Sequence, residues 1–129
     1  MHKELIICLI VFVLIISLDL ITKYYTENVV YTLNTELENF KQKLISDDIK
    51  QEEAKEQMQN IMNLWRKKYE IIAYYIEHDE LEKVETELTA LSSSIDVEEY
   101  DDGVENLDRC MFILNHIKNK YIIEVKNIF

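Results

Sequence analysis

Proline is absent from this 129-residue sequence, glycine occurs once and cysteine twice. Without these interrupting residues, and with abundant Glu, Lys, Leu and Ile, the composition favours an all-helical protein. The two cysteines are far apart: Cys8 lies within an apolar run and Cys110 near the other end, so we expect no disulfide framework. The formal net charge is −11, whereas nucleic-acid-binding proteins need a positively charged surface, so nucleic acid is not an expected partner.

Motifs for catalysis are also lacking. The sequence contains no glycine-rich loop that could hold a phosphate and no motif of an activated nucleophile. The acidic segment 98–109 does not fit a calcium-binding loop, because Gly103 at the sixth position puts Tyr100 and Arg109 where oxygen ligands are required. Carboxylates are so frequent that no pair of them marks an acid–base site. We therefore expect a protein that is not an enzyme and uses no cofactor.

A long apolar run opens the sequence and extends from Leu5 to Ile21, charged only at Asp19. As a helix it would span roughly 25 Å, a little less than the hydrocarbon thickness of about 30 Å. No cleavage site of small residues follows it, as a secretory signal peptide would require. We therefore predict a retained transmembrane anchor over residues 1–22, with the lipid bilayer as its partner, and an acidic domain over residues 23–129.

The flanks of the apolar run bear on its orientation. Lys23, Tyr24 and Tyr25 follow the run directly, and residues of these types favour the interface between membrane and water. The short N-terminal flank is slightly positive, and positive flanks tend to stay in the cytoplasm. We therefore predict a single-pass protein of the cell membrane whose bulk lies outside the cytoplasm.

Apolar residues of the domain recur at three- and four-residue spacings and divide it into four helices. The first helix continues from the anchor and is predicted to stop near residues 46–48. Asp79 with Glu82 would form a capping box for the third helix, and Asp96 with Glu99 would cap the fourth. The apolar stripes of the four helices are Val30, Leu33, Leu37, Phe40 and Leu44; Ala54, Met58, Ile61, Trp65, Ile72 and Ile76; Leu81, Val84, Leu88, Leu91 and Ile95; and Tyr100, Val104, Leu107, Met111, Leu114, Tyr121 and Val125.

The connections between these helices are short, so neighbours should fold back antiparallel. The expected fold class is all-α: a single N-terminal transmembrane helix that continues into an antiparallel bundle of about four helices with coiled-coil-like packing. Folding the second helix onto the first puts Arg66, Lys67 and Lys68 level with Tyr24 and Tyr25. Contact with lipid headgroups is one interpretation of this cluster, and a solvated basic patch is the other.

Two histidines are predicted to meet where the third helix lies against the fourth. A tight turn at residues 95–96 pairs Leu81 with Phe112. One helical turn from this pair, toward the start of the third helix, His78 would face His116 within side-chain reach. We therefore expect a hydrogen bond that couples the two.

A metal site is the alternative for this end of the bundle, because His78, His116 and acids such as Glu80 supply metal ligands. Di-metal bundles use Glu-x-x-His pairs, however, and the residues three positions before the histidines are Tyr75 and Ile113. We therefore expect no metal.

Four parts of the sequence are distinctive: Trp65, Glu77 to Leu81, Phe112 to Ile117 and Asn127 to Phe129. Together they resemble a bacterial family of short, N-terminally anchored proteins known as domain of unknown function 4363, and the resemblance covers nearly the whole chain. It implies Gram-positive, often spore-forming hosts, one anchor and no assigned activity. Genes of this family often neighbour that of a small multi-pass membrane protein, so the resemblance also suggests such a partner by association.

Two classes of function remain. The first is a non-enzymatic interaction or scaffold module of the bacterial cell envelope, accessory to a multi-pass membrane protein or to a second copy of itself. The alternative is a ligand or metal sensor that uses the His78 and His116 region. An exposed apolar stripe would favour the first class, and a polar pocket with converging histidines the second. The candidate interaction or structural site is Trp65, His78, Glu80 and His116, and the candidate membrane interface is Lys23, Tyr24, Tyr25, Arg66, Lys67 and Lys68.

Overall fold

The structure of the protein, a computed structural model, describes residues 1–46 and 48–128, with side chains up to Tyr121. Its elements are α1 (His2–Ser46), α2 (Gln51–Ile72), α3 (His78–Asp96) and α4 (Tyr100–Ile128), and no strand occurs in the described residues. The predicted all-α fold with four helices is confirmed.

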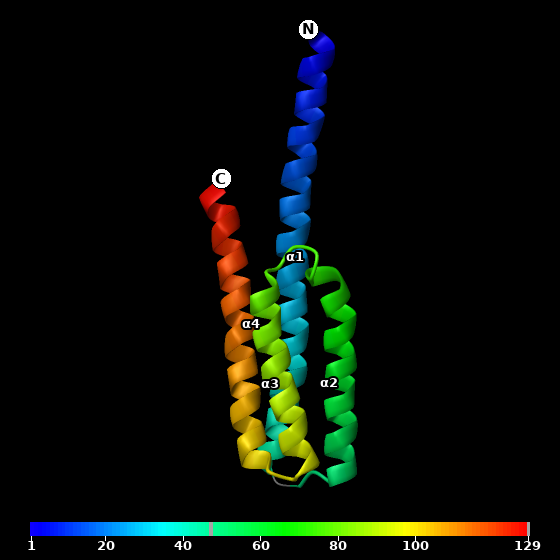
Figure 1. Ribbon diagram of the computed structural model, residues 1–129, viewed down its shortest axis with the longest axis vertical. Helices are drawn as coiled ribbons and strands as arrows, with labels where there is room; N and C mark the ends of the chain where they lie inside the picture. The colour runs from blue at the N-terminus through cyan, green and yellow to red at the C-terminus, as the bar shows by residue number, and fades with distance from the viewer. Residues whose placement is uncertain (47, 129) are drawn as a thin grey trace.

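Helix α1 is one unbroken helix with two parts of different character. Its N-terminal part stands clear of the other helices (Figure 1), and within it an apolar stretch of 18 residues has no buried residue. This stretch is long and apolar enough to cross a membrane. The C-terminal part buries a stripe of side chains, from Thr26 to Leu44, against the bundle. The prediction that the first bundle helix continues from the apolar run is confirmed.

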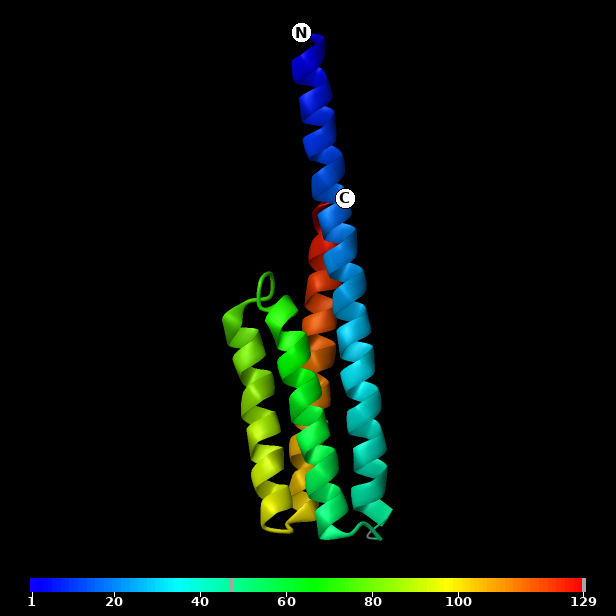
Figure 2. The same cartoon turned by 90° about the vertical axis from the view of Figure 1, so that its right-hand side faces the viewer.

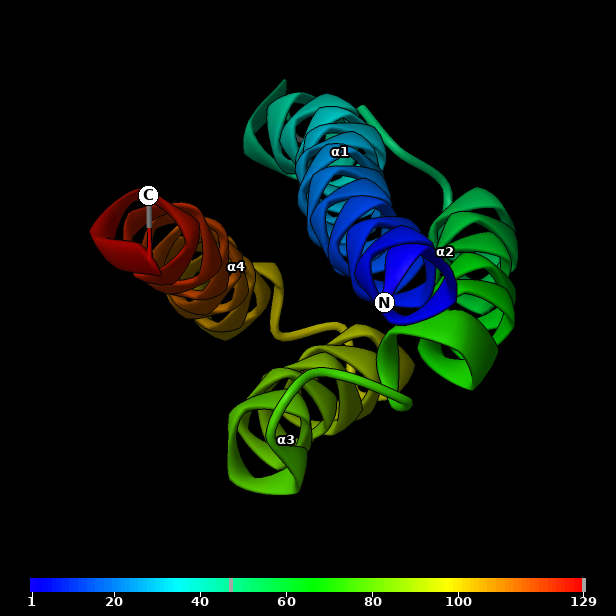
Figure 3. The ribbon, with the colours of Figure 1, turned by 90° about the horizontal axis from the view of Figure 1, so that it is seen from above.

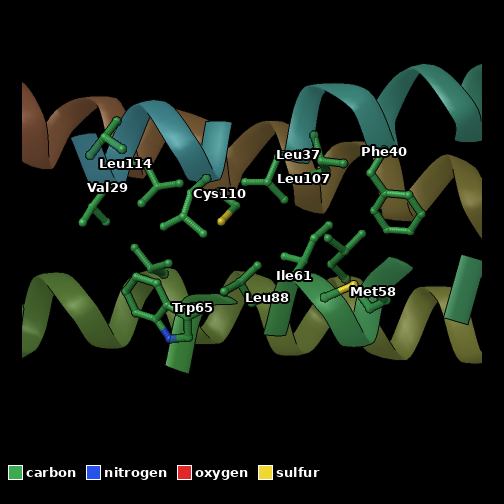
Figure 4. Close-up of a cluster of buried hydrophobic side chains, with 14 of the residues drawn as sticks. Val29, Leu37, Phe40, Met58, Ile61, Trp65, Leu88, Leu107, Cys110 and Leu114 are labelled. Carbon is green, nitrogen blue, oxygen red and sulfur yellow. The ribbon is translucent and has the colours of Figure 1, made fainter. Parts of the chain in front are cut away.

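The four helices form an antiparallel bundle with an apolar interior. Viewed along the bundle, they lie around a square in chain order (Figure 3), so that α1 and α3 each contact α2 and α4. Side chains from all four helices meet in the middle (Figure 4), where Phe40, Trp65, Leu88 and Leu107 are almost completely buried. We call the end of the bundle from which the apolar part of α1 emerges the upper end, as in Figure 1.

The connection from α3 to α4, at the lower end, differs from the predicted tight turn. Residues 97–99 form it, and Glu98 has a positive φ of 61°. The backbone N–H of Glu99 donates to the carbonyl of Ser94 over 2.9 Å, and that of Glu98 donates to Ile95 over 3.2 Å. These two bonds make a Schellman motif, in which glycine usually occupies the position of Glu98.

Both predicted capping boxes are wrong. Helix α3 begins at His78 after Glu77, which makes no side-chain capping hydrogen bond, so Asp79 already lies inside the helix. Asp96 is the last residue of α3 rather than the cap of α4. The turn at residues 97–99 causes this second error, because it lengthens the connection and delays the start of α4 to Tyr100.

Candidate functional site

Trp65 lies in the core, as its place on the apolar stripe of α2 predicts. Only 1% of its surface is exposed, and its indole N–H donates to Glu85 Oε1 of α3 over 3.2 Å. Tyr69, one turn along α2, packs against the indole with ring centroids 5.8 Å apart. Trp65 therefore joins α2 to α3 and offers little surface to a ligand.

The two histidines do not form the expected contact. Lys120 Nζ lies 3.4 Å from Glu77 Oε2, so Lys120 is the α4 residue at the level of His78. His116 precedes Lys120 by four residues and therefore lies about 6 Å lower, one helical turn away. Both histidines are exposed, and neither makes a hydrogen bond within the described part of the chain.

The same shift in register separates Leu81 from Phe112. Leu81 is buried, whereas Phe112 is 75% exposed on the outside of α4. The expected pairing of these residues is therefore wrong, because the three-residue turn moves α4 by about one helical turn relative to α3. Arg109, one turn before Phe112 on α4, pairs with Glu87 of α3 over 3.2 Å.

Glu80, the other predicted site residue of α3, pairs with lysines rather than with histidine. It is 7% exposed, and its Oε1 lies 3.6 Å from Lys83 Nζ and 3.8 Å from Lys120 Nζ. Its Oε2 is buried with no hydrogen-bond partner among the described atoms. The hydrogen bond from Lys120 to Glu77 raises the pKa of Lys120 and keeps it cationic. Since a buried carboxylate must be paired, this cluster holds α3 against α4.

The predicted level of the basic cluster on α2 agrees with the structure. Lys68 Nζ lies 5.8 Å from the centroid of the Tyr25 ring, within the range of a cation–π contact. Arg66 and Lys67 are exposed beside it, and Tyr24 of α1 is 73% exposed. Lys23 is half-buried at the same level. These residues of α1 and α2 lie near the upper end of the bundle, next to the apolar part of α1.

Tyr75 fixes the α2–α3 connection to α1, a role that its place in the sequence does not indicate. The hydroxyl of Tyr75 lies 2.7 Å from Thr26 Oγ1 and 3.4 Å from the carbonyl oxygen of Thr22. Tyr121 of α4 meets Tyr75 edge to face with centroids 6.4 Å apart, and its hydroxyl accepts the backbone N–H of Glu77. Burial raises the pKa of Tyr75, which therefore stays a neutral hydrogen-bonding group.

A groove runs down the outside of the bundle between α1 and α4. It starts at Tyr24 and Glu27, just below the apolar part of α1, and continues past Tyr31 into a hollow of about 580 Å³. Tyr31 is 73% exposed on its rim, and Asn34 donates to Asn115 across it over 3.0 Å. The sequence does not reveal this groove, because the spacing of apolar residues identifies the inward faces of helices and not the clefts between their outer faces.

Metal ligands do not gather anywhere in the described residues: no group of three or more His, Cys, Asp or Glu side chains is placed to hold a metal ion there. At the lower end, Glu98, Glu99, Asp101 and Asp102 line an open hollow together with Leu44 and other residues. This hollow is acidic, and neither His78 nor His116 lines it.

These features define the class of protein: an antiparallel four-helix bundle built onto an N-terminal helix that is apolar enough to cross a membrane. The chain belongs to the family described as "Domain of unknown function (DUF4363)", whose sequence model matches residues 20–128. The matched range begins at the end of the apolar run and includes the whole bundle. Comparisons with curated proteins and with solved structures found no match.

Proposed function

We propose that this chain is a membrane-anchored, non-enzymatic interaction module of the cell envelope. Residues 1–22 act as an uncleaved signal anchor, and the bundle stands outside the cytoplasm. The groove between α1 and α4 receives a helix of a membrane protein that emerges from the bilayer beside the anchor. We propose that the occupant of the groove is a multi-pass membrane protein. The alternative occupant is a second copy of this chain, and crosslinking can distinguish the two.

The main support for this proposal is the position of the groove directly below the apolar part of α1. Its upper end is lined by Tyr24 and Glu27, directly below the apolar part of α1. A partner helix that crosses the membrane next to the anchor would therefore enter the groove without a bend. Tyr31 and Met111 provide aromatic and flexible apolar surface, residue types that are enriched where proteins associate.

The sensing alternative has less support from the described residues. It requires histidines that converge on one site. His78 and His116 are both exposed, and they lie about one helical turn apart along the bundle. The neighbouring carboxylate of Glu80 is already paired with Lys83 and Lys120.

Photocrosslinking in native membranes tests the proposal. A photoreactive phenylalanine analogue at Tyr31 in the groove should crosslink to one reproducible multi-pass membrane protein. The matched control is the same analogue at Asn63, an exposed position on the outside of α2 at a similar height, which should give no such product. A product twice the mass of the chain would assign the groove to a second copy. Identical products from both positions, or none from Tyr31, would contradict the proposed role of the groove.

A further inference from the structure

We propose that the α2–α3 connection seats the upper end of the bundle on the bilayer, with Tyr74 and Ile71 in contact with the lipid interface. The bundle is then attached to the membrane at two places, through the anchor and through this connection. The inference rests on the membrane anchor of the proposed function.

The height of the connection follows from its bonds to α1. Tyr75 is bonded to Thr26 and approaches the carbonyl of Thr22, the residue directly after the apolar run. Thr26 is five residues beyond Ile21, which corresponds to about 7.5 Å along a helix. The headgroup layer on each side of the hydrocarbon is about 5–8 Å thick. When the anchor spans the membrane, the α2–α3 connection therefore lies at the depth of the headgroups.

The side chains that this connection exposes suit that depth. Tyr74 is 91% exposed and Ile71 is 50% exposed, one turn apart at the end of α2. Figure 2 shows the connection at the upper end of the bundle, the end from which the apolar part of α1 emerges, and lower than the C-terminal end of α4. Tyrosine favours the membrane interface because its ring can lie among the upper acyl chains while its hydroxyl stays hydrated.

The polar surroundings favour an aromatic and apolar contact over an electrostatic one. Arg66 and Lys67 are exposed near the connection, but Glu70 and Glu77 are exposed there as well. Because charges of both signs are present, a neutral lipid surface should be sufficient. The orientation that results would point the upper opening of the α1–α4 groove toward the membrane.

Tryptophan scanning with brominated lipids tests the seating, because bromine quenches indole fluorescence at short range. The full chain is reconstituted in phosphatidylcholine vesicles whose lipids carry bromine either high on the acyl chain or near its end. Three variants are compared with the unchanged chain, in which buried Trp65 supplies a constant background. Tyr74→Trp reports on the connection and Phe12→Trp on the anchor. Tyr31→Trp is the matched control, another largely exposed tyrosine position about 15 Å beyond the end of the apolar run.

We expect Tyr74→Trp to lose most fluorescence with bromine high on the chain, Phe12→Trp to lose most with bromine near the chain end, and Tyr31→Trp to change little. If Phe12→Trp is quenched but Tyr74→Trp changes as little as Tyr31→Trp, the α2–α3 connection does not contact the bilayer, although the transmembrane anchor is supported. If Phe12→Trp is not quenched, the anchor itself fails, and the seating fails with it.

Discussion

The indole nitrogen of Trp65 lies 3.2 Å from Glu85 Oε1, and this hydrogen bond links the buried face of α2 to the outer edge of α3. The ring lies among core side chains (Figure 4). Its single polar atom reaches the carboxylate of Glu85, which is exposed at the surface. One residue therefore contributes both apolar burial and a charge-assisted hydrogen bond between two helices.

Replacing Trp65 with alanine should destabilise the bundle by roughly 3–5 kcal/mol, because it removes a fully buried aromatic side chain and leaves a cavity. Urea unfolding of the full chain in detergent micelles, followed by circular dichroism, measures this. Trp65→Phe keeps most of the buried area and loses the hydrogen bond, so its cost should be clearly smaller. Equal stability of Trp65→Ala and the unchanged chain would show that the indole is not part of the core.

Spacing alone was sufficient to predict the helices and most of the core. Trp65 and Leu88 lie on stripes that the 3.6-residue period identifies, and both are buried. The antiparallel return of α2 was also predictable, because a short connection leaves few alternatives, and it correctly placed Lys68 beside Tyr25.

The register of α4 was not predictable, because the residue that determines it carries no recognisable signal. A glycine at position 98 would have indicated the end of α3, but the chain has Glu98 there, and its one glycine lies inside α4. The error of one turn then propagated along the helix pair and placed His116 opposite His78. The α2–α3 connection was missed for a related reason: Tyr75 and Ile76 continue an apolar pattern past the end of α2.

Glu98→Gly should stabilise the protein by up to about 1 kcal/mol, because glycine adopts a positive φ without the steric cost that a side chain incurs. The matched control is Glu105→Gly, the same exchange at an exposed position inside α4, which should cost about 1 kcal/mol. Urea unfolding of both variants gives the comparison. A loss of stability in Glu98→Gly equal to that of the control would mean that residue 98 is not in the left-handed conformation.

His78→Ala and His116→Ala should have additive effects on the free energy of unfolding, to within about 0.5 kcal/mol, because the side chains lie on different turns. A double-mutant cycle measures the coupling, and thermal unfolding with and without zinc tests for a metal site in the same variants. Coupling well above that limit would require the two side chains to meet. Zinc stabilisation that disappears in each single variant would favour the sensing alternative.

Cys110 should be chemically inert in the folded protein. Burial, with a smaller contribution from Glu87, raises the pKa of its thiol from 9.0 to about 12. At pH values near 8 only about 10⁻⁴ of the folded thiol is ionised, and the thiolate is the reactive form. A water-soluble maleimide should therefore modify Cys110 only after denaturation, as mass spectrometry of the digested protein can establish.

The raised pKa of Cys110 also makes the stability of the folded protein depend on pH. The unfolded thiol begins to ionise near its ordinary pKa of 9.0 while the folded thiol stays protonated to about 12. The contribution of Cys110 to stability is therefore complete below pH 9 and declines as the pH rises through this interval. Cys110→Ala should weaken that decline. Rapid labelling of Cys110 in the native protein would contradict its burial.

The proposed orientation predicts that a cysteine at Ser93 can be labelled from outside the cell. Ser93 is exposed on α3 in the lower half of the bundle, and Cys110 can remain in place because it is buried. On intact cells, the Ser93→Cys variant should react with a maleimide that cannot cross membranes, because the slightly positive N-terminal flank favours a cytoplasmic N-terminus. The unchanged chain is the control for reaction at Cys8 and Cys110. Labelling that occurs only after lysis would reverse the orientation and place the α1–α4 groove on the cytoplasmic side.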